Sequence, residues 1–159
     1  MSVISTDKDA VILTLTVVAE FAASPEAVWD VWADARKLEQ WWDPPTFPAI
    51  FTRHDFIVGG ESRYFMTGPN GETSRGWWRI DAIDRPRRVD VANGLAGEDG
   101  GPVPGIEPMA GSVLFEAVGH GTRMTVVTRF VDEVQMETML TMGMQEGMVG
   151  GIGQIEGLL

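Results

Sequence analysis

The sequence predicts an α+β fold in which a long C-terminal helix lies against the concave face of one curved antiparallel sheet. Three observations support this prediction. Short strand patterns follow one another with connections of meander length, which favours antiparallel pairing. Two helix-start signals follow the first strand pattern. Residues 134–159 have the length of a long helix.

The first strand pattern covers residues 11–21, where side chains alternate as in a strand with one face in water. Ser24 and Pro25 then mark a helix start, because Ser caps free amides and Pro suits the first helical position. Asp34 is placed to cap a second short helix, which residues 44–45, both Pro, are expected to end.

Further strand patterns follow, separated by turns that contain Gly or Pro. They cover residues 46–57, 61–67, 75–83, 88–92, 112–118 and 122–131. Residues 93–111 interrupt this series, and they are rich in Gly and Pro with few large apolar groups. We expect a long loop there, which is either a surface connection or a lid at the mouth of a pocket.

The C-terminal segment has a broad apolar face when it is placed on one continuous helix. The members of this face are Val134, Leu140, Met144, Met148, Ile152, Ile155, Leu158 and Leu159. Its Met side chains could fill the core or re-pack around a ligand. Near the opposite side fall Gly143, Gly150, Gly153 and Gly157. They indicate either a homodimer contact between close backbones or a helix that glycine weakens.

Composition limits the classes of function. The 159 residues carry a formal net charge of −11, from 23 acidic and 12 basic side chains. Nucleic-acid binding needs clustered Lys and Arg, so we expect no nucleic-acid partner. The chain contains no Cys, which removes disulfides, thiolate nucleophiles and Cys-based metal sites.

Other kinds of site lack their sequence signals as well. The chain has two histidines, no Gly-rich phosphate loop, no His/carboxylate metal spacing and no nucleophile elbow. We therefore predict no cofactor, no metal and no catalytic residue. No apolar run approaches the roughly 18 residues of a membrane span, and residues 1–10 are polar. We expect a cytoplasmic protein without membrane insertion.

Five short motifs occur in order along the chain. They are Pro25-Glu26-Ala27-Val28-Trp29, Leu38-(x2)-Trp41-Trp42, Val58-Gly59-Gly60-(x3)-Tyr64-(x)-Met66-(x)-Gly68-(x2)-Gly71, Arg85-Pro86-Arg87-Arg88-Val89 and Gly121-Thr122-Arg123-Met124-Thr125. With these motifs the sequence resembles the START-like (SRPBCC) superfamily, in the branch homologous to the C-terminal domain of the heat-shock-protein-90 ATPase activator. The resemblance runs from about residue 11 to the end.

This resemblance implies a helix-grip fold, in which a curved antiparallel sheet of about six strands wraps round a long C-terminal helix. Two short helices would follow the first strand. It also implies that residues 1–159 form a single START-like ligand-binding domain. A cavity between sheet and helix would take a small, largely apolar molecule. The co-chaperones of this branch normally carry a second, N-terminal domain, and the branch name does not imply chaperone work for every member.

Strand parity indicates which side chains would line such a cavity. Neighbours in a strand point to opposite faces, and Trp78 shares parity with Ile80, so we expect Trp78 rather than Trp77 to point inward. Similar reasoning on the other elements gives seven candidate ligand-binding residues. They are Trp42, Tyr64, Met66, Trp78, Phe115, Met144 and Met148. Plain core packing is the alternative for each of them.

Polar groups in the cavity would set the orientation of a ligand. Parity places Arg63 and Arg129 on the outer face of the sheet if the apolar sides face the helix. His54, beside Arg53, could act as a general acid or base, but no second catalytic group is evident nearby. We therefore expect His54 to be a solvated strand residue, and His120 to face solvent from a turn.

Three functions remain open on the sequence. The first is binding of a small, largely apolar molecule. The second is an enzyme of the same fold, such as a cyclase or hydratase-like protein, which would need an ionisable group on the cavity wall. The third is a protein-interaction module of the co-chaperone type.

Overall fold

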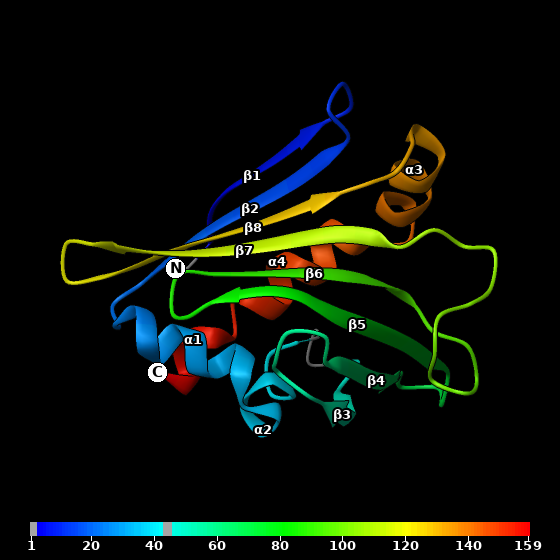
Figure 1. The fold of residues 1–159 in the computed structure, drawn as a ribbon, viewed down its shortest axis with the longest axis horizontal. Coiled ribbons are helices and arrows are strands. Elements are labelled where there is room, and N and C mark those ends of the chain that lie inside the picture. The colour runs from blue at the N-terminus through cyan, green and yellow to red at the C-terminus, as the bar shows by residue number, and fades with distance from the viewer. Residues whose placement is uncertain (1–2, 43–45) are drawn as a thin grey trace.

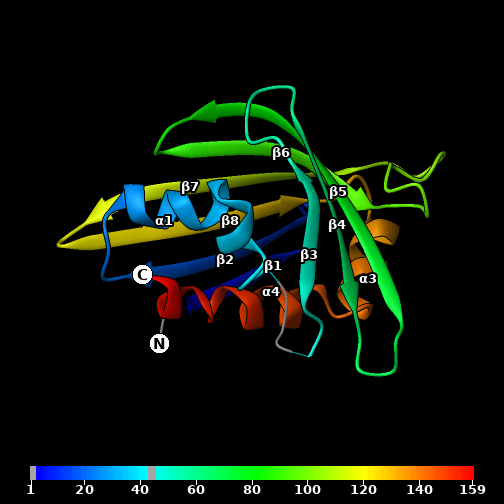
Figure 2. The same ribbon diagram turned by 90° about the horizontal axis from the view of Figure 1, so that it is seen from below.

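The structure is a computed structural model that describes residues 3–42 and 46–159. A strongly curved sheet dominates it, and the helical C-terminal segment crosses the concave side of that sheet (Figures 1 and 2). Two short N-terminal helices lie at one end of the sheet (Figure 2). In the described part of the chain, no helix is both long and apolar enough to cross a bilayer.

The described residues form eight strands. They are β1 (Val3–Asp9), β2 (Thr14–Phe21), β3 (Ala49–His54), β4 (Glu61–Thr67), β5 (Thr73–Asp84), β6 (Arg88–Leu95), β7 (Met109–Val118) and β8 (Gly121–Arg129). The helical elements are α1 (Pro25–Ala33), α2 (Ala35–Leu38), α3 (Glu133–Thr141), α4 (Met144–Ile152) and the 3₁₀ turn η1 (Ile155–Leu158).

All strands join one antiparallel sheet in the order β1-β2-β8-β7-β6-β5-β4-β3. Strands β3 to β8 form a continuous meander, and β2 pairs with the last of them, β8. The antiparallel α+β class and the helix-grip arrangement are therefore as the sequence predicted.

The strand count differs from the expected number of about six. No residue pattern indicated β1, because it is an edge strand that pairs with β2 alone and exposes most of its side chains. It therefore has no apolar face to read. The pattern assigned to 11–21 begins later, at Thr14, because Asp9 caps a turn at residues 10–13. The Asp9 carboxylate accepts hydrogen bonds from the amides of Val11 and Ile12 at 2.9 and 3.2 Å.

The two N-terminal helices begin where the sequence predicted. The Ser24 hydroxyl accepts a hydrogen bond from the Ala27 amide at 3.2 Å, and Pro25 is the first helical residue. The Asp34 carboxylate caps α2 through the amides of Arg36 and Lys37. The α2 helix already ends at Leu38, and residues 44–45, expected to end it, lie outside the described residues.

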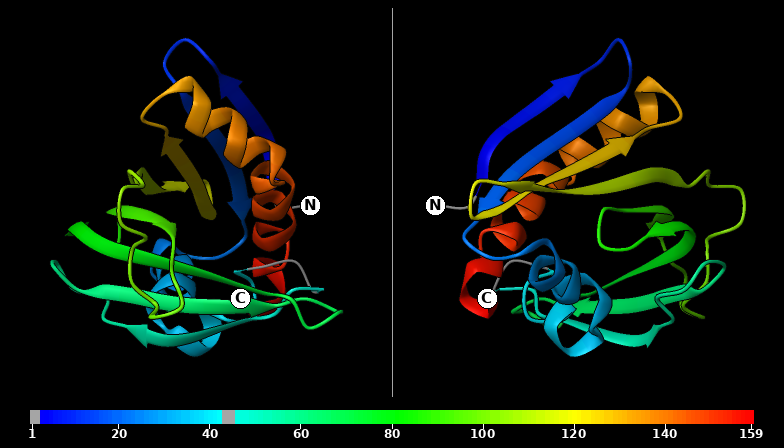
Figure 3. Two further views of the ribbon diagram at one scale, coloured as in Figure 1. Left: turned by 90° about the vertical axis from the view of Figure 1, so that its right-hand side faces the viewer. Right: turned by 60° about the vertical axis from the view of Figure 1, so that its left-hand side comes forward.

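The prediction of a single long helix at residues 134–159 is wrong. The segment is α3, α4 and η1 in succession (Figure 3). Gly143 separates the first two with a φ of +91°. Glycine adopts this left-handed conformation without steric cost, so the helix breaks there. The break also changes which way the first residues point: Val134, assigned to the apolar face, is 73% exposed. Ile152 and Ile155 are buried as expected.

The expected loop at 93–111 is shorter than predicted. Strand β6 extends to Leu95 and β7 begins at Met109, and an isolated bridge pairs Ala96 with Pro102 inside the loop. The β7–β8 hairpin turns at Gly119, which has a φ of +57°, and His120 is exposed there as expected.

Candidate functional site

A cavity of about 580 Å³ lies between the concave face of the sheet and the C-terminal helices. Its walls come from strands β4 to β8, from α3 and α4, and from residues at the end of α1 and in the segment after α2. The exposed lining residues Met142 and Glu146 mark where the cavity reaches the surface. Its volume falls within the range of small-molecule sites in proteins.

Six of the seven predicted ligand-binding residues line this cavity. They are Trp42, Tyr64, Met66, Trp78, Met144 and Met148. Phe115 does not line it: the ring is 2% exposed and packs edge-on against Trp29, with centroids 5.3 Å apart. Parity gave Phe115 the correct face of β7, but α1 covers that end of the sheet. Contact of the six residues with a ligand remains a prediction.

One wall of the cavity, the aromatic wall, consists of four indole rings. They are Trp32, Trp41, Trp42 and Trp78. These rings meet one another at interplanar angles of 42° to 73°, with centroids 4.7 to 6.1 Å apart. The Trp41 indole N–H donates to the Val31 carbonyl at 2.8 Å, and that of Trp32 points at the Met124 sulfur at 3.3 Å. Both polar edges are thus partnered away from the cavity.

Tyr64 stands next to the aromatic wall because a glycine faces it across the strands. Gly76 on β5 pairs with Tyr64 on β4, and a Cβ at Gly76 would lie 2.2 Å from the phenol ring. The Tyr64 ring also stacks on Phe51 at 4.9 Å. Trp77, which points to the other face of β5, is buried as well, next to Gly94.

The opposite wall, the methionine wall, comes from the C-terminal helices. Its members are Met139, Met142, Met144 and Met148. Unbranched thioether side chains can adapt to ligands of different shape. Gly143 and Gly147 also line the cavity between these side chains, so Gly143 does not belong to an outer stripe as expected.

One glycine that the sequence reasoning did not single out holds α4 against the aromatic wall. A Cβ at Gly151 would lie 2.7 Å from the carbonyl oxygen of Trp41 and 3.1 Å from that of Trp42. Gly151 is buried, whereas Gly150 and Gly157 have open space where their side chains would be. The close approach therefore occurs inside the fold, at a position that helix periodicity alone did not mark.

Polar side chains are few in the cavity. Glu146 is the only charged side chain that lines it within residues 3–42 and 46–159, and it is exposed at the mouth. Asn93, Ser112 and Thr128 lie on the sheet side of the lining, with Ser74 near the start of β5 and Thr46 in the segment after α2. The described residues contain no group of three or more His, Cys, Asp or Glu side chains that could hold a metal ion.

His54 is not the solvated strand residue that the sequence predicted. Its ring is half-buried, with Nε2 2.8 Å from the Trp32 carbonyl and Nδ1 2.7 Å from the Ser62 hydroxyl. The carbonyl can only accept, so Nε2 carries the proton and Nδ1 accepts from Ser62. Burial lowers the pKa of His54, although the Trp32 carbonyl opposes this shift. A β-bulge between Phe51 and Arg53 turns the ring inward, which simple parity could not anticipate.

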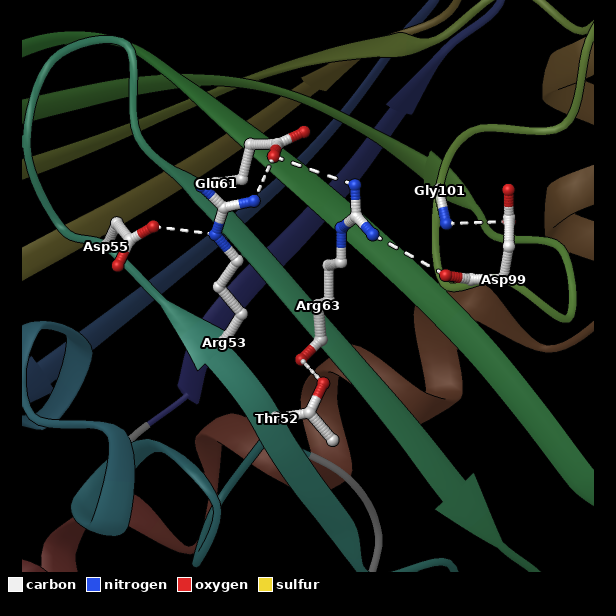
Figure 4. Close-up of polar contacts among 7 residues, drawn as sticks. All are labelled: Thr52, Arg53, Asp55, Glu61, Arg63, Asp99 and Gly101. Carbon is white, nitrogen blue, oxygen red and sulfur yellow. Dashed lines mark hydrogen bonds and ion pairs between the residues drawn. The ribbon is translucent and has the colours of Figure 1, made fainter.

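The arginines of β3 and β4 lie outside the cavity, as predicted for Arg63. Arg53 forms ion pairs with Asp55 and Glu61, and the Arg63 guanidinium lies 3.5 Å from the Asp99 carbonyl oxygen (Figure 4). The contact between Arg63 and Asp99 links the loop after β6 to the outer face of the sheet. None of residues 96–108 lines the cavity, so the contacts of this loop are those of a surface connection. Arg129 is exposed.

A curved sheet that grips a helical C-terminal segment around a largely apolar cavity defines a helix-grip protein. Comparison with known proteins identifies the family. The family described as "Activator of Hsp90 ATPase homolog 1-like protein" matches residues 22–159. The comparison with curated proteins returns no match.

Several solved structures match almost the whole chain. A protein from Arthrobacter aurescens is 44% identical, with a TM-score of 0.93 over 99% of this chain and 91% of that chain. Protein Ms6760 from Mycobacterium smegmatis is 39% identical, with a TM-score of 0.92 over 99% and 96% of the two chains. The AHSA1 protein from Silicibacter pomeroyi is 20% identical, with a TM-score of 0.71 over 91% and 95%, and shares the fold.

The chain therefore belongs to the Activator of Hsp90 ATPase homolog 1-like family, within the START-like group that its motifs predicted.

Proposed function

We propose that this protein is a START-like ligand-binding protein, with residues 1–159 as one binding domain. The ligand is a small, largely apolar molecule held between the sheet and the C-terminal helices. The observation that carries this proposal is the 580 Å³ cavity between an aromatic and a methionine wall. Apolar contact would drive binding, at about 25 cal/mol per Å² of buried surface before ordering costs.

The arrangement of ionisable groups favours binding over catalysis. An enzyme of the cyclase or hydratase type would need a general acid or base that touches the substrate. His54 is outside the cavity lining, and both its ring nitrogens are within hydrogen-bond distance of protein atoms. The ionisable side chains of the described lining are Glu146, which lies at the exposed mouth, and Tyr64, whose ring stacks on Phe51. The co-chaperone alternative rests on the family relationship alone.

Two glycines on α4 provide a matched test of the binding site. Gly147 lines the cavity and has open space where its side chain would be, whereas Gly150 has similar space but does not line the cavity. A Gly147→Leu variant should fill the site, and a Gly150→Leu variant makes the same change outside the cavity, where it can alter self-association but not the space for the ligand. Binding of the fluorescent probe N-phenyl-1-naphthylamine should weaken at least about tenfold in the first variant alone.

Native mass spectrometry of the freshly purified protein complements this test. A co-purified small molecule that Gly147→Leu lacks and Gly150→Leu retains would support the proposal. An apo mass in all three proteins, together with no probe binding by the wild type, would contradict it.

We further propose that the exposed side of the C-terminal segment forms a homodimer contact. Gly150 and Gly153 are exposed, and a Cβ at Gly150 would meet no atom within 4 Å. A Gly150→Leu, Gly153→Leu double variant should then elute later than the wild type in size-exclusion chromatography. An unchanged elution volume would rule out this contact.

A further inference from the structure

The floor of the cavity contains a polar notch formed by three neighbouring strands. Its residues are Asn93 on β6, Gly111 on β7 and Thr128 on β8, and all three line the cavity. The surrounding lining is mostly apolar, with Val91 and Val126 next to the notch. A group of polar atoms at this position can therefore distinguish between ligands of similar shape.

Thr128 is the most deeply buried member of the notch. It is 3% exposed, and its hydroxyl makes no hydrogen bond with any other residue in the described ranges 3–42 and 46–159. The hydroxyl oxygen is nevertheless not completely enclosed. Among the described residues, the only completely enclosed side-chain polar atom without a partner is Nε of Arg63. Buried hydroxyl groups in proteins nearly always have a hydrogen-bond partner. Within the described residues, the Thr128 hydroxyl is therefore open to a hydrogen bond with what occupies the cavity.

Asn93 has hydrogen-bonding capacity to spare. Its amide nitrogen lies 3.5 Å from the Met109 carbonyl oxygen, at the outer limit for a hydrogen bond. Its carbonyl oxygen and second N–H make no further hydrogen bond with the described residues. The side chain therefore offers both a donor and an acceptor.

Gly111 lies between these two residues and has no side chain to occupy the position beside them. A Cβ at Gly111 would lie 3.3 Å from the Asn93 amide nitrogen and 3.1 Å from a Val91 methyl carbon. Gly111 pairs directly with Thr128 across β7 and β8. Directly opposite residues in antiparallel strands have Cβ atoms about 5 Å apart. Asn93 and Thr128 thus flank the same empty position from two sides.

We propose that this notch binds an uncharged oxygen of the ligand, so that the ligand is a hydrophobic alcohol or ketone rather than a hydrocarbon or a carboxylate. A carbonyl oxygen can accept from both Asn93 and Thr128, and a hydroxyl can donate to one and accept from the other. No Lys, Arg or His of the described chain lines the cavity to neutralise a buried carboxylate. This inference rests on the proposed function.

The test compares two molecules of the same shape, 2-naphthol and 2-methylnaphthalene, which differ by a hydroxyl in place of a methyl group. Each is used to displace N-phenyl-1-naphthylamine from the wild type and from Thr128→Val, which replaces the hydroxyl by a methyl group. Thr128→Val should weaken 2-naphthol about 2- to 10-fold, the range expected for one hydrogen bond. The affinity for 2-methylnaphthalene should change less than about twofold.

Two further variants sharpen the result. Gly111→Ala fills the notch and should reduce the preference for 2-naphthol in the same way. Thr125→Val makes the same chemical change as Thr128→Val on the same strand, at a residue that does not line the cavity, and should have no effect on either molecule.

The outcomes separate this inference from the function on which it rests. If the wild type binds both molecules but Thr128→Val weakens them equally or not at all, the notch does not recognise oxygen, and the binding function stands. If neither molecule nor the probe binds the wild type, the proposed binding function is wrong and the inference falls with it.

Discussion

The two walls of the cavity are built differently. On the aromatic wall, Trp41 is 2% exposed, lies edge-on to its neighbours and is fixed by a 2.8 Å hydrogen bond to Val31. On the methionine wall, Met142 is 61% exposed, and the helix is interrupted beside it at Gly143. One wall is therefore part of the hydrophobic core, whereas the other covers the core at a break in the helix.

This difference assigns separate roles to the two walls. Interlocked rings with partnered N–H groups hold one shape, because each ring restricts the rotamers of the next. Methionine side chains on a broken helix can change rotamer at low cost. We infer that the aromatic wall contributes most to stability and that, under the proposed function, the methionine wall adapts to the shape of the ligand.

The largest expected effect is on the aromatic wall. Trp41→Ala should lower the free energy of unfolding by about 3–5 kcal/mol, because it removes a buried ring and leaves a cavity. Met142→Ala, on the methionine wall, should change it by less than about 0.5 kcal/mol. Urea unfolding followed by circular dichroism measures both.

Equal losses in these two variants would show that the walls contribute alike to stability. If Trp41→Ala does not fold, Trp41→Phe keeps a ring and removes the indole hydrogen bond to Val31. It should still cost about 1–3 kcal/mol, because the buried carbonyl loses its partner.

The next largest effect on stability is expected at Gly151, where α4 contacts the aromatic wall. Gly151→Ala should destabilise the protein by about 1–3 kcal/mol, because its Cβ would press on the Trp41 and Trp42 carbonyls. Gly150→Ala, one residue earlier in open space, should stabilise it by up to about 1 kcal/mol through helix propensity. Thermal denaturation of both variants gives the comparison, and the same sign of shift in both would contradict the close approach.

A smaller effect concerns the support behind the aromatic wall. The ring centroids of His54 and Trp78 are 5.8 Å apart, and Nε2 of His54 donates a hydrogen bond to the Trp32 carbonyl. Burial lowers the pKa of His54. Because the folded protein then favours neutral His54, the unfolded state binds more protons as pH falls below about 6.5. The stability that neutral His54 provides should be present above this pH and be lost below it.

Replacing His54 by Gln should flatten this pH dependence. Urea unfolding at pH 7.5 and 5.5 measures the loss in each protein, and the wild type should lose more than His54→Gln. The Gln variant should also be less stable at pH 7.5, by about 1 kcal/mol for one hydrogen bond. If the wild type and His54→Gln lose the same stability between pH 7.5 and pH 5.5, His54 does not change its charge in this range.

The features of the fold that depend on local residue pattern could be predicted from the sequence. The Ser24 and Asp34 caps, the β4 boundaries and the inward face of Trp78 follow from residue type and period alone. Strand β1 could not be predicted in the same way, because an edge strand with both faces in water has no apolar period. The register of the broken C-terminal helix depends on one backbone angle at Gly143.

The candidate site shows the same limit. Six lining residues follow from strand and helix faces, but the position of Phe115 depends on which end of the sheet α1 covers. His54 faces inward because of a bulge, and Gly151 matters because a distant carbonyl approaches it. These features come from contacts between segments that are remote in the sequence. Periodicity within one segment carries no information about them.

The smallest expected effect is on ligand charge at the methionine wall. Glu146 is the only charged side chain lining the cavity in the described part of the chain, and it lies at the mouth, where solvent screens it. Glu146→Gln should therefore raise the affinity for decanoate by about 2- to 5-fold, in keeping with the modest strength of exposed charge pairs. Displacement of N-phenyl-1-naphthylamine measures this, with decan-1-ol as the uncharged control, whose affinity should not change. Because Glu and Gln have nearly the same size, an effect of ligand charge should appear with decanoate alone, and a similar gain for both molecules would contradict it.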